Sequence, residues 1–161
     1  MGIAELINSL LLLVAVVGIG LTYSQVRKGA RTHRAQFLKE LYLTMTADAD
    51  ICEAYYRIEY SKFKYGEDFH DSKIELQVDR LLAFADLVAE LYLQSALSKR
   101  EMVFFQYRFR RIYEDREIQA YLDFLASFYK QVGVSKEPYH SFQQVAKQFI
   151  GVNASVNLPK R

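Results

Sequence analysis

The run from Leu6 to Tyr23, LINSLLLLVAVVGIGLTY, holds eighteen residues without a charge and constrains the fold more than any other feature. At 1.5 Å rise per residue, a helix of this length approaches the bilayer hydrocarbon thickness of about 30 Å. A cleaved signal peptide needs a basic segment before the apolar run and a small-residue cleavage site after it. Glu5 is the only charge before the run, and no A-x-A pattern follows. We therefore expect residues 1–26 to be a retained transmembrane anchor.

Charge is distributed asymmetrically around this run. No Lys or Arg precedes Arg27, and no Asp or Glu lies between Arg27 and Glu40. By the positive-inside rule, the N-terminus faces out and the rest of the chain is cytosolic. The expected location is thus the inner (cytoplasmic) membrane, with the lipid bilayer as a partner and residues 27–47 as a basic juxtamembrane helix. The basic residues that set this topology are Arg27, Lys28, Arg31, Arg34 and Lys39.

The rest of the chain is expected to be all-α. Apolar residues recur there at helical spacing, and strand-like alternation is almost absent. A composition of 51% hydrophobic residues excludes a disordered chain, and the single cysteine, Cys52, excludes an internal disulfide. The fold class predicted is one N-terminal transmembrane helix followed by a compact cytosolic helical bundle of about five helices. The bundle occupies residues 48–151, and residues 152–161 form a flexible tail.

Capping residues mark where the helices begin and end. Ser72 with Glu75, and Ser98 with Glu101, match the S-x-x-E capping box, and Asp115 is a single-residue cap. Gly66, Gly133 and Gly151 mark helix ends. The expected helices cover residues 35–46, 51–65, 74–97, a segment opened by Ser98, 116–132, and a segment from Pro138 to Gly151.

The third of these helices is the longest and most apolar, which predicts a central position in the core. Its carboxylates Asp79, Asp86 and Glu90 share the opposite side, which we interpret as a solvated face. The apolar stripe expected to face the core consists of Leu76, Leu81, Phe84, Leu87, Val88 and Leu91.

The fourth helix combines basic and aromatic residues. Met102, Phe105, Phe109 and Ile112 follow the i, i+3, i+4 rule and are expected to face inward. The remaining face suits a short anionic nucleotide, because guanidinium groups fork onto phosphates and aromatic rings stack on bases. The candidate ligand-binding residues are Arg100, Phe104, Tyr107, Arg108, Arg110 and Arg111.

A structural interpretation competes with ligand binding on this helix. The arginines would pair with Glu114, Asp115, Glu117 or acids of the third helix, and Phe104 would pack against a neighbouring subunit. A second candidate surface lies in YYRIEYSKFKY, where the alternative is a tyrosine-rich helix pair buried in the core. The candidate residues there are Tyr56, Arg57, Tyr60, Lys62 and Lys64.

The sequence favours a protein that is not an enzyme. It contains no Gly-rich phosphate loop, no H-E-x-x-H, no nucleophile elbow and no Cys/His ligand spacing. We therefore predict no catalytic residues, no metal site and no cofactor.

A resemblance rests on the order of three features: the apolar run, then RKGARTHR, then a helical region carrying DRLLAFADLVAELYLQSALSKREMVFFQYRFRR. In this architecture the chain resembles small bacterial membrane-tethered helical proteins, and within them the membrane-anchored effectors of type III CRISPR systems. The resemblance implies antiviral defence, in which the cytosolic domain senses cyclic oligoadenylate and the protein acts at the membrane.

The resemblance also implies a homo-oligomer, for example a tetramer, in which Arg and Tyr side chains of each copy take one phosphate or base of the ring. The competing hypothesis is a non-enzymatic membrane-tethered subunit whose helical domain docks a protein partner through its aromatic face. The salt dependence of nucleotide binding separates the two, because phosphate contacts release counterions and weaken steeply with salt.

Overall fold

The computed structural model of the chain describes residues 25–26, 29 and 32–154. The predicted membrane-spanning run from Leu6 to Tyr23 and the end of the predicted tail lie outside the described residues. Within the described part, no helix combines the length and apolarity that a bilayer crossing requires. Regular secondary structure in that part is entirely α-helical, which confirms the predicted all-α class.

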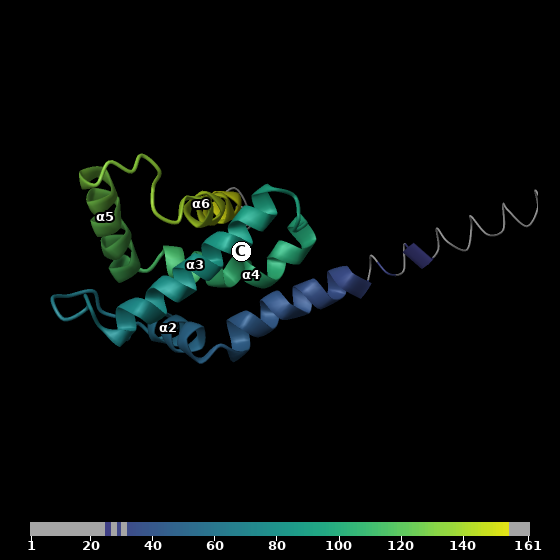
Figure 1. Cartoon of the computed structure of the whole chain (residues 1–161), viewed down its shortest axis with the longest axis horizontal. Helices are drawn as coiled ribbons and strands as arrows, with labels where there is room; N and C mark the ends of the chain where they lie inside the picture. The colour runs from purple at the N-terminus through teal and green to yellow at the C-terminus, as the bar shows by residue number, and fades with distance from the viewer. Residues whose placement is uncertain (1–24, 27–28, 30–31, 155–161) are drawn as a thin grey trace, which may run out of the picture. The chain divides into compact units, whose positions relative to one another are not determined.

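The chain divides into two compact units, residues 1–41 and 42–161. In the first unit, residues 32–41 are helical. The second unit continues with a helical segment over residues 42–47 and then contains five labelled helices (Figure 1). These are α2 (Ala49–Glu59), α3 (Lys73–Leu93), α4 (Lys99–Tyr113), α5 (Arg116–Gln131) and α6 (His140–Ala154).

Helix α3 is the centre of the second unit. It contacts α2 on one side and α6 on another, and α6 also contacts α4. Helix α5 stands at one end of the unit, with its axis across that of α3 in the view of Figure 1. Helix α3 is therefore covered by other helices, whereas α5 lies at the edge of the unit.

Local capping chemistry starts the helices where the sequence predicts. The Ser98 side chain accepts from the Glu101 amide, and the Glu101 carboxylate accepts from the Ser98 amide at 2.7 Å, so this capping box is confirmed. The Asp115 carboxylate accepts from two amides of the first turn of α5. The Ser72 box is half formed, because the Glu75 carboxylate accepts instead from the Asp71 amide at 2.7 Å.

Three predicted helix ends are wrong, those of α2, α3 and α6. Helix α2 stops at Glu59 rather than near Gly66, because Ser61 takes a φ of 55° and the Lys62 amide turns back to the Arg57 carbonyl oxygen at 2.7 Å. This turn buries Phe63, which adjoins Phe69 with ring centroids 5.6 Å apart.

Helix α3 likewise stops at Leu93 rather than residue 97. Ser95 has a φ of 62°, and the chain folds back so that Leu97 is buried. In the other direction, α6 runs through Gly151 to Ala154, beyond its predicted end.

The predicted core stripe of α3 is partly wrong. Leu81, Phe84 and Val88 are buried as expected, but Leu76 and Leu87 are 67% and 53% exposed, and Leu91 is half-buried. The core face of α3 is instead completed by small and apolar residues outside the predicted stripe. These are Val78, Leu82, Ala85 and Ala89.

The prediction of a solvated acidic face on α3 is also wrong. Asp79 Oδ1 accepts from the Tyr121 hydroxyl at 2.8 Å and from the Tyr139 hydroxyl at 3.0 Å. Asp86 Oδ1 accepts from the Phe142 amide at 2.9 Å, in the first turn of α6. A carboxylate there satisfies an amide without a helical partner and complements the positive end of the helix dipole.

Candidate functional site

Helix α4 turns its apolar side inward and leaves its basic residues to the outside. Met102, Phe105, Phe109 and Ile112 are buried, as predicted. This placement brings the opposite side of α4 beside the C-terminal half of α2. The contacts between these two helices decide what each predicted site residue is able to do.

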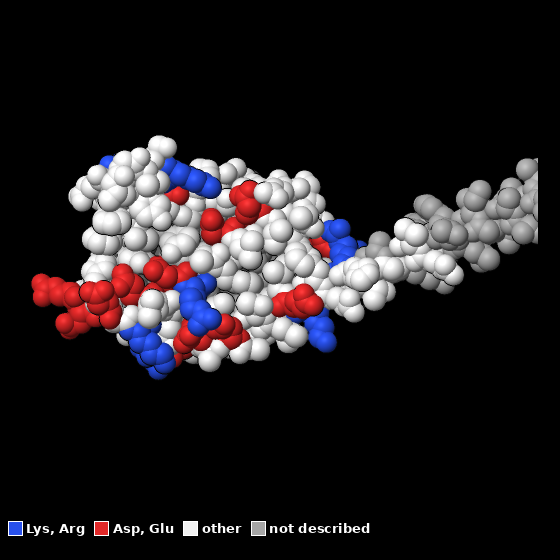
Figure 2. All heavy atoms as spheres, in the orientation of Figure 1, with Lys and Arg blue, Asp and Glu red and all other residues white. Residues whose placement is uncertain are grey.

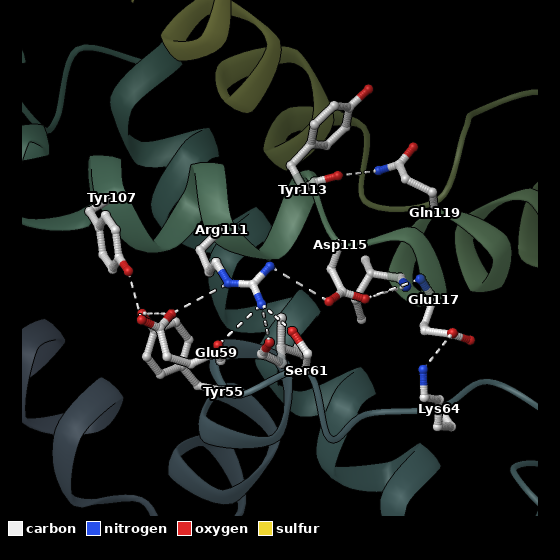
Figure 3. Close-up of polar contacts among 12 residues, drawn as sticks. Tyr55, Glu59, Ser61, Lys64, Tyr107, Arg111, Tyr113, Asp115, Glu117 and Gln119 are labelled. Atoms are coloured by element: carbon white, nitrogen blue, oxygen red, sulfur yellow. Dashed lines mark hydrogen bonds and ion pairs between the residues drawn. The ribbon is translucent and has the colours of Figure 1, made fainter.

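Arg111 crosses to the end of α2 (Figure 3). Its Nη2 donates to the carbonyl oxygens of Ile58 at 2.6 Å and Glu59 at 3.1 Å. Carbonyls in the last turn of a helix lack intrahelical partners, and a cation there complements the negative end of the dipole. The Arg111 side chain is 25% exposed and also lies 3.7 Å from the Asp115 carboxylate. Arg111 therefore acts as a C-terminal cap for α2.

The Glu59 carboxylate joins the two helices. Oε2 accepts from the Tyr55 hydroxyl at 3.0 Å, and Oε1 accepts from the Tyr107 hydroxyl at 2.6 Å (Figure 3). Arg111 Nε lies 3.7 Å from the same carboxylate. The hydrogen bond to Glu59 raises the pKa of Tyr107, and burial, followed by its hydrogen bond to Glu59, raises the pKa of Tyr55. Both tyrosines therefore remain protonated donors at neutral pH.

The other arginines of α4 differ in their surroundings. Arg110 Nε lies 2.9 Å from the carboxylate of Glu114, one turn along the helix. The Arg108 guanidinium carbon lies 5.3 Å from the ring centre of Tyr55 and 6.0 Å from that of Tyr42, a cation–π arrangement. Arg100 is exposed. The expected pairing of arginines with Glu114 and Asp115 is thus present for Arg110 and Arg111.

Exposed rings surround these paired charges. Phe104 is 67% exposed and Tyr60 is 65% exposed. Tyr56 and Tyr60 stack with ring centroids 5.9 Å apart, and Tyr56 adjoins the buried Tyr55. We call the exposed rings of this region the aromatic surface, which consists of Tyr42, Tyr56, Tyr60, Phe104 and Tyr107.

The basic residues of the second predicted surface do not form one site, because each takes part in a separate contact. Arg57 lies 2.8 Å from Glu53, and Lys64 lies 3.3 Å from Glu117 on α5. Lys62 lies 6.0 Å from the ring centre of Tyr60. The alternative, a tyrosine-rich helix pair buried in the core, is wrong for Tyr56 and Tyr60, because both are exposed.

Figure 2 shows the distribution of charge on one face of the molecule. Acidic side chains gather at the end where the loop between α2 and α3 lies, while Lys and Arg side chains stand apart from one another. Glu67, Asp68 and Asp71 are exposed in that loop. Among the described residues, no group of three or more His, Cys, Asp or Glu side chains is placed to hold a metal ion.

Sequence reasoning missed Glu59, the residue that connects both candidate surfaces. The i, i+4 spacing of Tyr55 and Glu59 is a readable signal for their hydrogen bond. The bond between Glu59 and Tyr107 joins residues 48 positions apart and has no such local signal.

Comparisons of the chain with protein-family models, with curated proteins and with solved structures find no match.

Proposed function

We propose that the chain is a non-enzymatic, membrane-tethered subunit whose helical domain docks a protein partner through the aromatic surface. One observation carries this proposal: Arg110 and Arg111 are engaged by groups of the domain itself, while the rings beside them are exposed. Tyr, Phe and Arg are enriched at protein interfaces, and charge is depleted at interface centres. The tether rests on the uncharged run from Leu6 to Tyr23.

The internal pairing of charge favours a protein over an anion as the partner. A phosphate at Arg111 would have to displace the Ile58 and Glu59 carbonyl oxygens and compete with the Glu59 carboxylate. A protein side chain that packs against Phe104 or Tyr60 disturbs none of these contacts. Such rings bury large areas and frequently dominate binding energy.

Site-specific photocrosslinking tests this proposal on the full chain in its membrane. A photoreactive phenylalanine analogue replaces Phe104, and the same analogue replaces the exposed Gln144 of α6 as the control. We expect a discrete protein adduct from position 104 and none from position 144. Equal adducts at both positions, or none at either, would contradict docking at this surface.

A second candidate function is the sensing of cyclic oligoadenylate or another short anionic nucleotide by an antiviral membrane effector. The arrangement that favours it is Arg108, whose guanidinium lies over the rings of Tyr42 and Tyr55, one helical turn from Phe104. A guanidinium held over rings keeps its edge free to fork onto a phosphate. Here the exposed rings would stack on bases instead of protein side chains.

Salt dependence distinguishes the two functions. Nucleotide binding is measured by titrating cyclic tetra-adenylate against the full chain in detergent, at low and at physiological salt. Counterion release predicts that nucleotide affinity falls steeply as salt rises, and that Arg108→Gln reduces affinity at least tenfold, equivalent to about 1.4 kcal/mol. If the nucleotide shows no saturable binding at low salt, this second function is excluded and protein docking remains.

A further inference from the structure

The carboxylates beside the aromatic surface are already engaged by donors of the unit itself. Glu59 accepts hydrogen bonds from two tyrosine hydroxyls. Glu101 accepts from the Ser98 amide at 2.7 Å. Glu114 lies 2.9 Å from Arg110, one turn away on the same helix. These carboxylates therefore need no cation from another molecule.

The cations beside the same rings lack such partners. Within the part of the chain that the structure describes, Arg100, Arg108 and Lys62 form no ion pair with a carboxylate. The Arg108 guanidinium lies over the rings of two tyrosines, 5.3 Å and 6.0 Å from their centres. Lys62 Nζ lies 6.0 Å from the ring centre of Tyr60. Arg100 and Lys62 are exposed, so the uncompensated charge of this surface is positive.

Two of these cations lie in one row with an exposed ring between them. Arg100, Phe104 and Arg108 follow one another at four-residue spacing on α4, so they are neighbours along one face of the helix. At 1.5 Å rise per residue, the two arginines are about 12 Å apart along the axis. The Phe104 side chain between them is 67% exposed. The outer face of α4 thus presents a cation, a ring and a second cation in line.

We propose that the protein partner docks on the aromatic surface with an acidic segment, in which carboxylates flank an apolar side chain. This inference rests on the proposed function and names the chemistry of the partner. The apolar side chain packs against Phe104, and the flanking carboxylates pair with Arg100 and Arg108. A partner helix that carries an acid, an apolar residue and an acid at four-residue intervals matches the row in length.

Charge complementarity is the reason for an acidic partner rather than a neutral or basic one. Lysine or arginine on the partner would set like charges together, which disfavours that partner, whereas carboxylates speed association and fix the register. Burial of the rings supplies most of the binding energy. A single phosphate group reaches one arginine of the row and leaves Phe104 uncovered, whereas a protein segment covers all three positions.

The test uses the full chain in an unfractionated cell lysate, with the photoreactive phenylalanine analogue at position 104. Arg100→Gln and Arg108→Gln are combined in one variant. Lys99→Gln is the matched control, because Lys99 is exposed on the same helix but lies about 140° around it from Phe104. We expect the protein adduct to fall about fivefold in the double variant and to stay level in the control. Raising the salt concentration should weaken the adduct of the original chain as well.

Two further measurements sharpen the test. Mass spectrometry of the adduct should identify a peptide with Asp or Glu within about four residues on both sides of the crosslinked position. Arg108→Lys keeps the positive charge, so it should retain more adduct than Arg108→Gln. Circular dichroism should show the same helical signal for each of these variants, because the substituted side chains lie outside the core.

The outcomes separate this inference from the proposed function. If position 104 gives no adduct, or an adduct with nucleic acid or lipid, the proposed function fails and the acidic segment with it. A protein adduct that the double variant leaves unchanged would overturn the acidic segment alone. A crosslinked peptide without flanking acids, or an equal fall for Lys99→Gln, would also overturn it and leave protein docking in place.

Discussion

Nη2 of Arg111 on α4 donates to the carbonyl oxygen of Ile58 on α2 at 2.6 Å, so one helix supplies the C-terminal cap of another. Arg111→Ala removes this cap and leaves two carbonyl oxygens and the Glu59 carboxylate without their cation. We expect the free energy of unfolding to fall by about 1.5 to 3 kcal/mol, the range for hydrogen bonds to charged groups. Denaturant unfolding followed by circular dichroism measures this change.

Arg110→Ala is the matched control for that variant. Arg110 pairs with Glu114 on the exposed side of the same helix, and a pair of this kind contributes less than about 0.5 kcal/mol. Equal effects of the two substitutions would show that Arg111 is no cap.

The Asp79 carboxylate is expected to be a main connection between α3 and α5. Asp79→Ala deprives the hydroxyls of Tyr121 and Tyr139 of their common acceptor. Because both hydroxyls are part-buried, we expect a loss of about 2 to 3 kcal/mol in unfolding free energy. Asp123→Ala, at an exposed position of α5, serves as the control in the same unfolding measurement, and a loss as large there would contradict the specific role of Asp79.

The capping box of α4 gives a smaller effect. Ser98→Ala removes the oxygen that accepts from the Glu101 amide, which typically costs about 1 kcal/mol. Ser127→Ala in α5 changes the same chemical group inside a helix, where alanine has the higher helix propensity, so its melting temperature should stay level or rise. A drop for Ser127→Ala as large as for Ser98→Ala would mean that the effect is not one of capping.

Stability is expected to decline on both sides of neutral pH. Among the described residues, hydrogen bonds lower the pKa of four carboxyls. In Glu90 the largest contribution comes from Ser141, and in Glu117 it comes from the Tyr65 amide. A carboxyl with a lowered folded-state pKa binds protons more readily when unfolded. Its stabilisation is present above about pH 4 and is lost as the pH falls through the folded-state pKa.

Tyrosines produce the alkaline decline. Burial is the main cause of the raised pKa of Tyr121 and Tyr139. Their contribution is therefore complete below about pH 10, the ordinary tyrosine value, and is lost as the pH rises through the folded-state pKa. The urea concentration at the unfolding midpoint, compared at pH 3, about 7 and 11, measures both declines in stability. Tyr139→Phe should make the decline between about pH 7 and 11 less steep. An equally steep alkaline decline in that variant would contradict the assignment to tyrosine.

The position of the chain in the membrane has its own test. A reporter fused after Arg161 should be active in the cytosol, because basic residues follow the apolar run and none precedes it. The protein should also remain in the membrane fraction after washing with high salt or alkali. Recovery in the soluble fraction would contradict the anchor.

Local chemistry accounts for what the sequence predicted well. The caps at Ser98 and Asp115 depend on atoms within three residues of each other, and the inward face of α4 follows from spacing alone. The end of α2 was not predictable in the same way, because Ser61 adopts a left-handed conformation that glycine usually takes. Burial of Phe63 against Phe69 compensates for that conformation only in the folded unit.

The candidate site was predictable as a set of residues but not as a set of contacts. The sequence shows that α4 has arginines and rings on its outer side. It does not show that Arg111 reaches Ile58 or that Tyr107 reaches Glu59, which lie about fifty positions apart. For the same reason, the carboxylates of α3 looked solvated, although Asp86 receives an amide from α6.

Arg111 has one more neighbour whose position links two distant parts of the chain. The buried Asp115 accepts from the Glu117 and Ile118 amides at the start of α5, and its second oxygen lies 3.7 Å from Arg111. The Arg111 guanidinium, which caps the C-terminus of α2, therefore also holds in place the Asp115 carboxylate, which caps the N-terminus of α5. In hydrogen exchange, the last turn of α2 and the first turn of α5 should consequently lose protection together, as a single opening unit, although more than fifty residues separate them in the chain.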